Sequence, residues 1–168
     1  MTLELPANSQ PAGEILKSDP ALKKQLSALK DSENARVLQI LDSRTGAQRA
    51  AMVIDTGKGS YRIRDVEVCK EFVIVSDSQN RVVVYSRESG ATVGRTFGSL
   101  AAVDPAGMRI AVRNTGGEIR LHDLATMTEQ DRFQFASTVS RAAFRSDGQV
   151  LNVLTSAQEV LRLDVSKQ

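Results

Sequence analysis

One short strand-like phrase occurs three times in the second half of the chain, and its spacing constrains the fold more than any other feature. The copies begin at Arg81, Glu118 and Glu159, and each alternates in polarity before a small polar residue. They end at Ser86, Asp123 and Asp164, which are 37 and 41 positions apart, and a looser, earlier copy spans residues 37–42. A period of about 40 residues with several short strands per unit is typical of a β-propeller.

From residue 37 onward apolar residues recur with a period of two, which predicts strands. Residues 37–42 and 47–54 form a predicted hairpin. Further strands are predicted at residues 62–68, 72–77, 81–86, 92–97, 99–104, 109–113, 118–123, 131–135, 139–145, 150–155 and 159–165. We expect sheet-packing positions at Val73, Val75, Ile110, Val112, Leu151 and Val153. The predicted fold class is therefore all-β, with about three four-stranded antiparallel propeller units and a short N-terminal helical segment.

The first 36 residues differ in character and form a predicted N-terminal extension, with the partial propeller at residues 37–168. The sequence Ser18-Asp19-Pro20 is a helix start, and we expect a helix within residues 13–30. Leu22, Leu26 and Leu29 fall on one face of it. This apolar stripe either packs on the propeller or binds a partner, so these three leucines are the predicted partner-binding residues.

Charge and composition exclude several classes of protein. Basic and acidic side chains number 22 and 20 in the 168 residues, so no strong global field would attract nucleic acid or lipid. The single cysteine, Cys69, precludes an intrachain disulfide and favours a reducing compartment. The N-terminus lacks the pattern of a signal peptide, and no apolar run is long enough to span a bilayer. We expect an intracellular, cytoplasmic chain without membrane contact.

Two kinds of segment carry a resemblance to a known family. The segment from Asn114 to Thr126 has a glycine turn, an alternating apolar run and then His122-Asp123. It is similar to the third strand of the WD-repeat β-propeller family, which has tryptophan at the position of His122. The turn from Phe144 to Gly148 resembles the family's turn between its first and second strands, and residues 103–107 form a second version. The resemblance covers about residues 37–165. It implies a propeller fold, and its motifs do not specify a function.

The chain also departs from the family pattern. Tyr85, His122 and Leu163 occupy the tryptophan positions, and no Gly-His pair precedes a first strand. The family's hydrogen-bonded tetrad therefore cannot form here, and apolar packing must carry more of each blade's stability.

The number of blades is too small for a closed ring, which needs about four or more. In the family's register the chain holds two strands of one blade, two full blades and three strands of another. Thr2–Leu5 is a candidate for the missing outer strand beside residues 159–164. We therefore expect an oligomer, in which a second copy or another protein completes the propeller and covers its open sheet faces.

Residues that could support chemistry are few. His122 is the only histidine, and its neighbour Asp123 points to the opposite face of the strand. One histidine and one cysteine cannot build the usual zinc site, and Gly57-Lys-Gly59 and Gly116-Gly117 lack the context of phosphate-binding loops. We predict no catalytic residue, no cofactor and no metal ligand.

The function predicted from sequence is a non-catalytic protein–protein interaction scaffold. The alternative is a propeller enzyme or ligand-binding domain with a site at the central channel, for which Asp65, Glu67 and Asp104 are the candidate ligands. A weaker alternative is nucleic-acid binding through the many arginines, which a salt series would detect.

Overall fold

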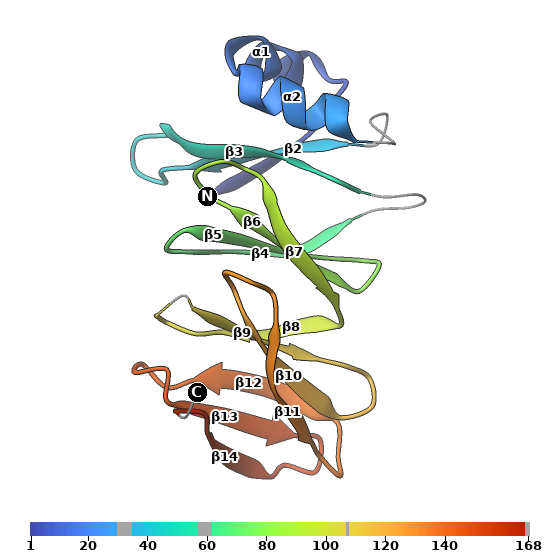
Figure 1. Cartoon of the computed structure of the whole chain (residues 1–168), viewed down its shortest axis with the longest axis vertical. Helices are drawn as coiled ribbons and strands as arrows, with labels where there is room; N and C mark the ends of the chain where they lie inside the picture. Colours follow the sequence, from blue (N-terminus) through green and yellow to red (C-terminus); the bar gives the residue numbers. More distant parts are fainter. Residues whose placement is uncertain (30–34, 57–61, 107, 167–168) are drawn as a thin grey trace. The chain divides into compact units, whose positions relative to one another are not determined.

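The computed structural model describes residues 1–29, 35–56, 62–106 and 108–166. The elements, in chain order, are β1 (Thr2–Pro6), α1 (Gln10–Ser18), α2 (Pro20–Ala28), β2 (Arg36–Leu41), β3 (Gln48–Ile54), β4 (Ile63–Cys69), β5 (Phe72–Asp77), β6 (Arg81–Ser86), β7 (Thr92–Phe97), β8 (Ser99–Val103), β9 (Arg109–Arg113), β10 (Glu118–Asp123), β11 (Glu129–Gln134), β12 (Val139–Phe144), β13 (Val150–Thr155) and β14 (Val160–Asp164). The all-β prediction is confirmed, and most strand bounds agree within one or two residues (Figure 1).

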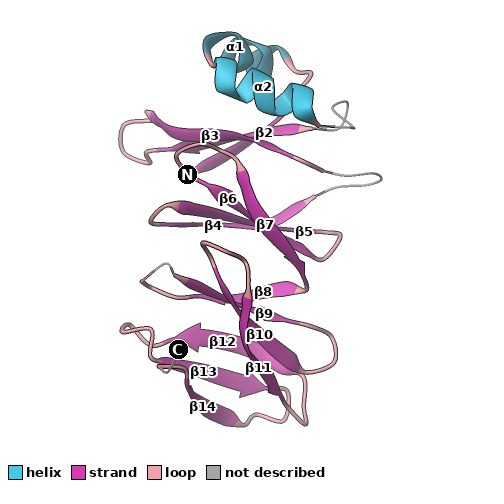
Figure 2. Ribbon diagram, viewed as in Figure 1, coloured by secondary structure: helices cyan, strands magenta, loops and turns pink. Residues whose placement is uncertain are grey.

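The strands form four antiparallel sheets (Figure 2). Two sheets have four strands, in the orders β4-β5-β6-β7 and β11-β10-β9-β8. Two have three strands, in the orders β1-β2-β3 and β12-β13-β14. Each sheet is a meander of neighbouring strands apart from the helices between β1 and β2, which is the plan of propeller blades.

The chain divides into two compact units. The first contains Met1–Arg62 with the turn Ser86–Ala91, and the second contains Ile63–Tyr85 with Thr92–Gln168. The boundary predicted at residue 36 lies inside the first unit, where β1 pairs with β2. The division into an extension and a propeller at that residue stays a prediction.

The prediction for Thr2–Leu5 was wrong. Thr2 is paired with Ile40 and Leu5 with Val37, so this segment is the edge strand of the first sheet, not the outer strand beside β14. Tertiary packing explains the result, because Leu5 adds its side chain to the apolar face that contains Val37 and Val53. A strand of five residues pairs with either edge equally well in its backbone, so side-chain packing decides.

Two short helices replace the single helix expected within residues 13–30. The predicted start is confirmed, because the Asp19 Oδ1 accepts hydrogen bonds from the N–H groups of Ala21 and Leu22 at 3.0 and 3.2 Å. Pro20 disfavours a helical conformation at the residue before it, so α1 ends at Ser18. Ser9 caps α1, with its Oγ accepting from Ala12 N–H.

The helices cover one face of the first sheet (Figure 1). Leu16 and Leu22 are buried against Val37 and Val53, and Ala12 is buried in the same cluster. None of the helices in the described ranges is long and apolar enough to cross a membrane.

Apolar residues at every second position fill the spaces between the sheets of the second unit. One cluster joins Ile74, Val82 and Val84 to Ile110 and Val112. A second joins residues of β9 and β10 to Leu151 and Val153. All six predicted packing positions are at most 2% exposed, which confirms that prediction. These clusters hold the loops of adjacent sheets beside one another.

Candidate functional site

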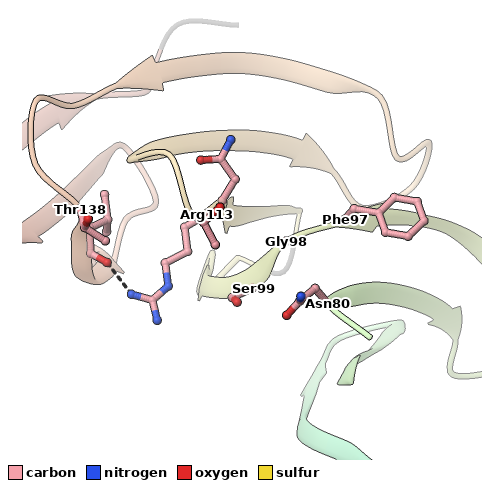
Figure 3. Close-up of a pocket in the computed structure, with 9 residues that line it drawn as sticks. Asn80, Phe97, Gly98, Ser99, Arg113 and Thr138 are labelled. Carbon is pink, nitrogen blue, oxygen red and sulfur yellow. Dashed lines mark hydrogen bonds between the residues drawn. The ribbon is translucent and has the colours of Figure 1, made fainter. Parts of the chain in front are cut away.

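A pocket of about 400 Å³ lies where several turns of the second unit meet. It is lined by Asn80, Phe97, Gly98, Ser99, Arg113, Asn114, Thr115, Thr138 and Val139. Asn80 belongs to the turn between β5 and β6, Gly98 joins β7 to β8, and Thr115 lies in the turn between β9 and β10. The pocket is therefore made by the ends of consecutive sheets, with Thr138 contributed from the segment before β12 (Figure 3).

Gly98 is the single residue between β7 and β8, so the chain passes from one sheet to the next at this position. Its φ is +142°, and its N–H donates to the Asn80 carbonyl at 2.8 Å. A Cβ at this position would lie 2.6 Å from the Arg113 carbonyl oxygen and 2.6 Å from a methyl group of Val112. Glycine is thus required both by the backbone conformation and by the close approach.

Arg113 spans the pocket toward the last sheet. Its Nη1 donates to the carbonyl oxygens of Val139 and Ser140, at 2.5 and 3.0 Å. Figure 3 shows the guanidinium reaching across to the segment that contains Thr138. Because these acceptors are neutral carbonyls, the positive charge is not cancelled by them and remains available to an acidic group.

Phe97 is the exposed aromatic side chain of this region, with 64% of its surface accessible. It is the last residue of β7, and Figure 3 shows its ring at the opposite end of the pocket from Thr138. An exposed aromatic ring and an arginine that line the same pocket match the enrichment of aromatic and arginine side chains at protein interfaces.

A buried ion pair supports the first of the turns. Arg81 Nε donates to the Asp77 Oδ2 at 2.7 Å, and both side chains are less than 10% exposed. The other oxygen of Asp77 accepts the N–H groups of Gln79 and Arg81. This fixes the turn in which Asn80 adopts a φ of +56°. An aspartate that accepts backbone N–H groups a few residues later is a local turn motif, which can be recognised in the sequence alone.

A second ion pair lies in the hairpin of β8 and β9, and its arginine also bonds to the next sheet. Arg109 Nε donates to the Asp104 Oδ2 at 3.2 Å, while its Nη1 and Nη2 donate to the carbonyls of Val165 and Gly148, each at 2.6 Å. The guanidinium also lies over the ring of Phe144, 5.6 Å from its centroid. Arg81 and Arg109 are therefore paired with carboxylates within the protein, which reduces the number of arginines available for phosphate contacts.

The candidate channel ligands are not brought together. Asp104 is buried in the pair with Arg109, whereas Asp65 and Glu67 are exposed on β4. Asp65 lines a polar pocket of about 480 Å³ together with Arg113 and Arg141. Across residues 1–29, 35–56, 62–106 and 108–166, no three His, Cys, Asp or Glu side chains lie close enough to hold a metal ion.

His122 and Cys69 occupy structural positions. His122 is 5% exposed and its Nε2 lies 3.3 Å from the Thr96 hydroxyl on the adjacent sheet. Burial lowers the pKa of His122, against smaller opposing effects from the Met127 backbone and Glu129. Cys69 is half-buried at the end of β4, where it packs against the cluster between the sheets.

The three predicted partner-binding leucines belong to the first unit. Leu22 is 1% exposed, and Leu26 and Leu29 pack half-buried against the same cluster. Leu22 therefore holds the helix on the sheet, while parts of Leu26 and Leu29 remain accessible. Their contact with a partner stays a prediction. The glycine cluster at 57–59 lies outside the described residues, and Gly116-Gly117 lies in the turn between β9 and β10.

Sequence reasoning missed the pocket residues and the two ion pairs. One signal was present, since a strand-ending aspartate is followed four or five residues later by an arginine in both Asp77–Arg81 and Asp104–Arg109. No sequence pattern marked Phe97. The alternation of apolar residues predicts a strand, but it does not predict which end of the strand lines a pocket.

Comparison with solved structures defines the class of fold. The chain resembles a chain in the crystal structure of the mitotic checkpoint complex, with a TM-score of 0.60 and 17% identity, over 80% of this chain and 44% of that one. It also resembles the RRP9 WD40 repeats, with a TM-score of 0.56 and 15% identity, over 66% of this chain and 38% of that one. No family model matches the sequence. No curated protein matches it either.

The chain thus has the fold of WD-like β-propeller blades, as the repeat predicted. It spans less than half the length of either of these two propeller chains. At these identities the likeness establishes the fold alone, and function must be argued from the residues of the site.

Proposed function

We propose that the chain is a non-catalytic protein-interaction scaffold that binds its partner at the pocket around Phe97 and Arg113. The observation that carries this proposal is the 64% exposed ring of Phe97 at the rim of a pocket of about 400 Å³. Aromatic and arginine side chains dominate binding energy when a partner covers them. The amide side chains of Asn80 and Asn114 supply the polar rim.

The proposed partner is a protein with an apolar group that covers Phe97 and an acidic group that approaches Arg113. The guanidinium of Arg113 has only carbonyl acceptors within the described residues, so a carboxylate would form the stronger, charge-assisted bond. Further blades, contributed by that partner or by a second copy, would complete the propeller. Leu26 and Leu29 provide a second, smaller proposed contact at the helices.

The positions of the three candidate channel ligands disfavour a propeller enzyme with a site at the central channel. Asp104 is buried in an ion pair with Arg109, whereas Asp65 and Glu67 are exposed on β4, so the three candidate ligands do not share one site. The pocket offers hydrogen-bond donors and an exposed ring, which serve recognition.

Quantitative affinity capture from cells tests the proposal, followed by titration of the purified partner. Phe97→Ala removes the anchor, and Thr115→Arg places a bulky group at the exposed rim of the pocket. Both variants should weaken binding by tenfold or more, about 1.4 kcal/mol, while leaving thermal stability unchanged. Met108→Ala is the matched control, because Met108 is also an exposed apolar side chain (47%) but does not line this pocket. Retention of the same partners at the same affinity by both pocket variants would refute the proposal.

A further inference from the structure

The third strand of the last sheet lacks the neighbour that its two internal counterparts have. β6 and β10 each lie between two strands, whereas β14 pairs only with β13 among the described residues. The face of β14 is open as well. Val82 and Ile119, at the equivalent position of the repeated phrase, are fully buried under residues of the following sheet, whereas Val160 has no such cover among the described residues and is 73% exposed. Leu161 is 37% exposed beside it.

The free edge of β14 presents backbone hydrogen-bonding groups. The Thr155 N–H donates to the Glu159 carbonyl, and the Val165 N–H donates to the Gln149 carbonyl. In an antiparallel ladder these bonds alternate along the strand, so the N–H and C=O groups of Val160 and Arg162 point away from β13. An edge of this kind accepts an extended segment by strand addition.

The two complete sheets show which residues a fourth strand places against this edge. In the third sheet Asp131 is opposite Leu121, and Phe133 is opposite Ile119. Leu121 and Ile119 are the repeat equivalents of Arg162 and Val160, because Asp123 and Asp164 end their respective copies. The added strand would therefore place one residue opposite Arg162 and, two positions later, another opposite Val160.

Side-chain chemistry at the edge specifies those two residues. Arg162 is exposed and forms no ion pair with a side chain of the described part of the chain. On the same face, Arg162 is paired across the ladder with Asn152, and Arg141 is paired with Leu154. The corresponding pair in the third sheet is Leu121 with Ala111, so this face has become basic. Cross-strand pairing then favours a carboxylate opposite Arg162 and an apolar side chain opposite Val160.

We propose that β14 binds an extended segment of a partner protein, which adds antiparallel as a fourth strand and carries an acidic residue, any residue and then an apolar residue. This inference rests on the proposed scaffold function and names a second surface and the chemistry of its partner. A second copy is a poorer occupant through β14 itself. Full antiparallel overlap of two β14 strands places Arg162 opposite Arg162, and like charges in that position are destabilising.

The chain supplies a suitable probe. Residues 130–135 contain Asp131, Arg132 and Phe133 in the required order, and they already occupy this position in the third sheet. An acetylated and amidated peptide of this sequence would be titrated to about 2 mM into the isotopically labelled protein. We expect saturable NMR shifts centred on the amides of Val160, Arg162 and Asp164, and slowed hydrogen exchange of those amides.

Three variants test the specificity. Arg162→Pro removes an outward N–H without disturbing the bonds to β13, and should abolish saturation. Arg162→Glu should weaken binding about tenfold, and a peptide with Asp131→Lys should restore it for this variant. Arg95→Glu, at an exposed arginine of β7, is the control and should bind like wild type.

Several results would overturn the inference. These are an absence of saturation with wild type, shifts elsewhere on the protein, or equal binding by Arg162→Pro. Concentration-dependent dimerisation that Arg162→Pro abolishes would assign the edge to a second copy instead. A negative peptide titration at β14 would not change the result of the affinity capture with the Phe97 variants. A negative capture result would likewise not change the titration, so each proposal can be refuted without the other.

Discussion

Arg109 connects the third and fourth sheets, and its removal should be among the most destabilising single changes in the chain. The guanidinium donates to Asp104 at 3.2 Å and to the carbonyls of Gly148 and Val165 at 2.6 Å. Its side chain is 17% exposed and that of Asp104 is 3% exposed. Removing one partner of a buried pair leaves the other charge without compensation, which costs about 3–5 kcal/mol.

The perturbation is Arg109→Met, which keeps the apolar stem over Phe144 and removes the charge. The expected loss is a large share of the ~5–15 kcal/mol that stabilises a typical domain. For a chain of this length it corresponds to roughly 2–4 °C in Tm for each kcal/mol. Urea unfolding followed by circular dichroism gives the free energy of unfolding directly. Adding Asp104→Asn to the variant should recover part of the loss, because the uncompensated charge is then gone.

The control is Arg132→Met, at an arginine whose side chain is 54% exposed and whose ion pairs involve Glu118 and Glu129. Exposed pairs contribute about 0–1 kcal/mol, so this variant should unfold near wild type. A loss below about 1 kcal/mol for Arg109→Met would refute the reasoning. Simple additivity of Arg109→Met and Asp104→Asn would refute it as well, because it would show that the two groups are not coupled.

Two further outcomes can be checked in the same unfolding assay. Gly98→Ala should destabilise by about 1–3 kcal/mol because of its positive φ and the 2.6 Å approach of a Cβ to neighbouring atoms, whereas Gly116→Ala, whose nearest neighbour lies at 3.4 Å, should be nearly neutral. The pKa of His122 is lowered by burial, so the unfolded chain binds a proton first as pH falls below about 6.5, and stability should decrease from pH 7.5 to 5.5. His122→Gln should flatten that dependence, and an unchanged slope would contradict the assignment.

The repeat predicted the fold because its alternation marks the positions that sheets bury against one another. Val82 and Ile119 share one position of the phrase and are both fully buried, and strands with this pattern fold into sheets wherever their neighbours supply apolar faces. Turn chemistry set the boundaries, as at Asn80, which adopts a positive φ beside the Asp77 cap. Local signals of this kind do not depend on the partner of a strand, so they can be recognised in sequence.

Pairing of the edge strands could not be predicted in the same way. Thr2–Leu5 alternates suitably for several edges, and only the packing of Leu5 with Val37 and Val53 selects β2. The pocket residues were hidden for a related reason. Phe97 and Arg113 come together through the close approach at Gly98, which is a tertiary contact between sheets.

The helices cover a face of the first sheet that would otherwise be open, and this gives a last prediction about association. Leu22 is 1% exposed between α2 and the sheet residues Val37 and Val53. Leu22→Asp would bury an unpaired carboxylate there, at a cost of several kcal/mol, so the helices should separate from the sheet. The uncovered apolar face should then bind a hydrophobic dye and increase association in sedimentation at micromolar concentration, relative to wild type.

Lys23→Asp makes the same change in residue type one position along the helix, where the side chain is exposed, and should behave as wild type. If Leu22→Asp neither binds the dye nor associates more than this control, the helices do not protect the sheet. In that event the first sheet would be stable with its apolar face in water. A partner could then bind Leu26 and Leu29 whether or not the helices pack on the sheet. An increase confined to Leu22→Asp would instead show that the helices protect the apolar face of the first sheet that contains Val37 and Val53.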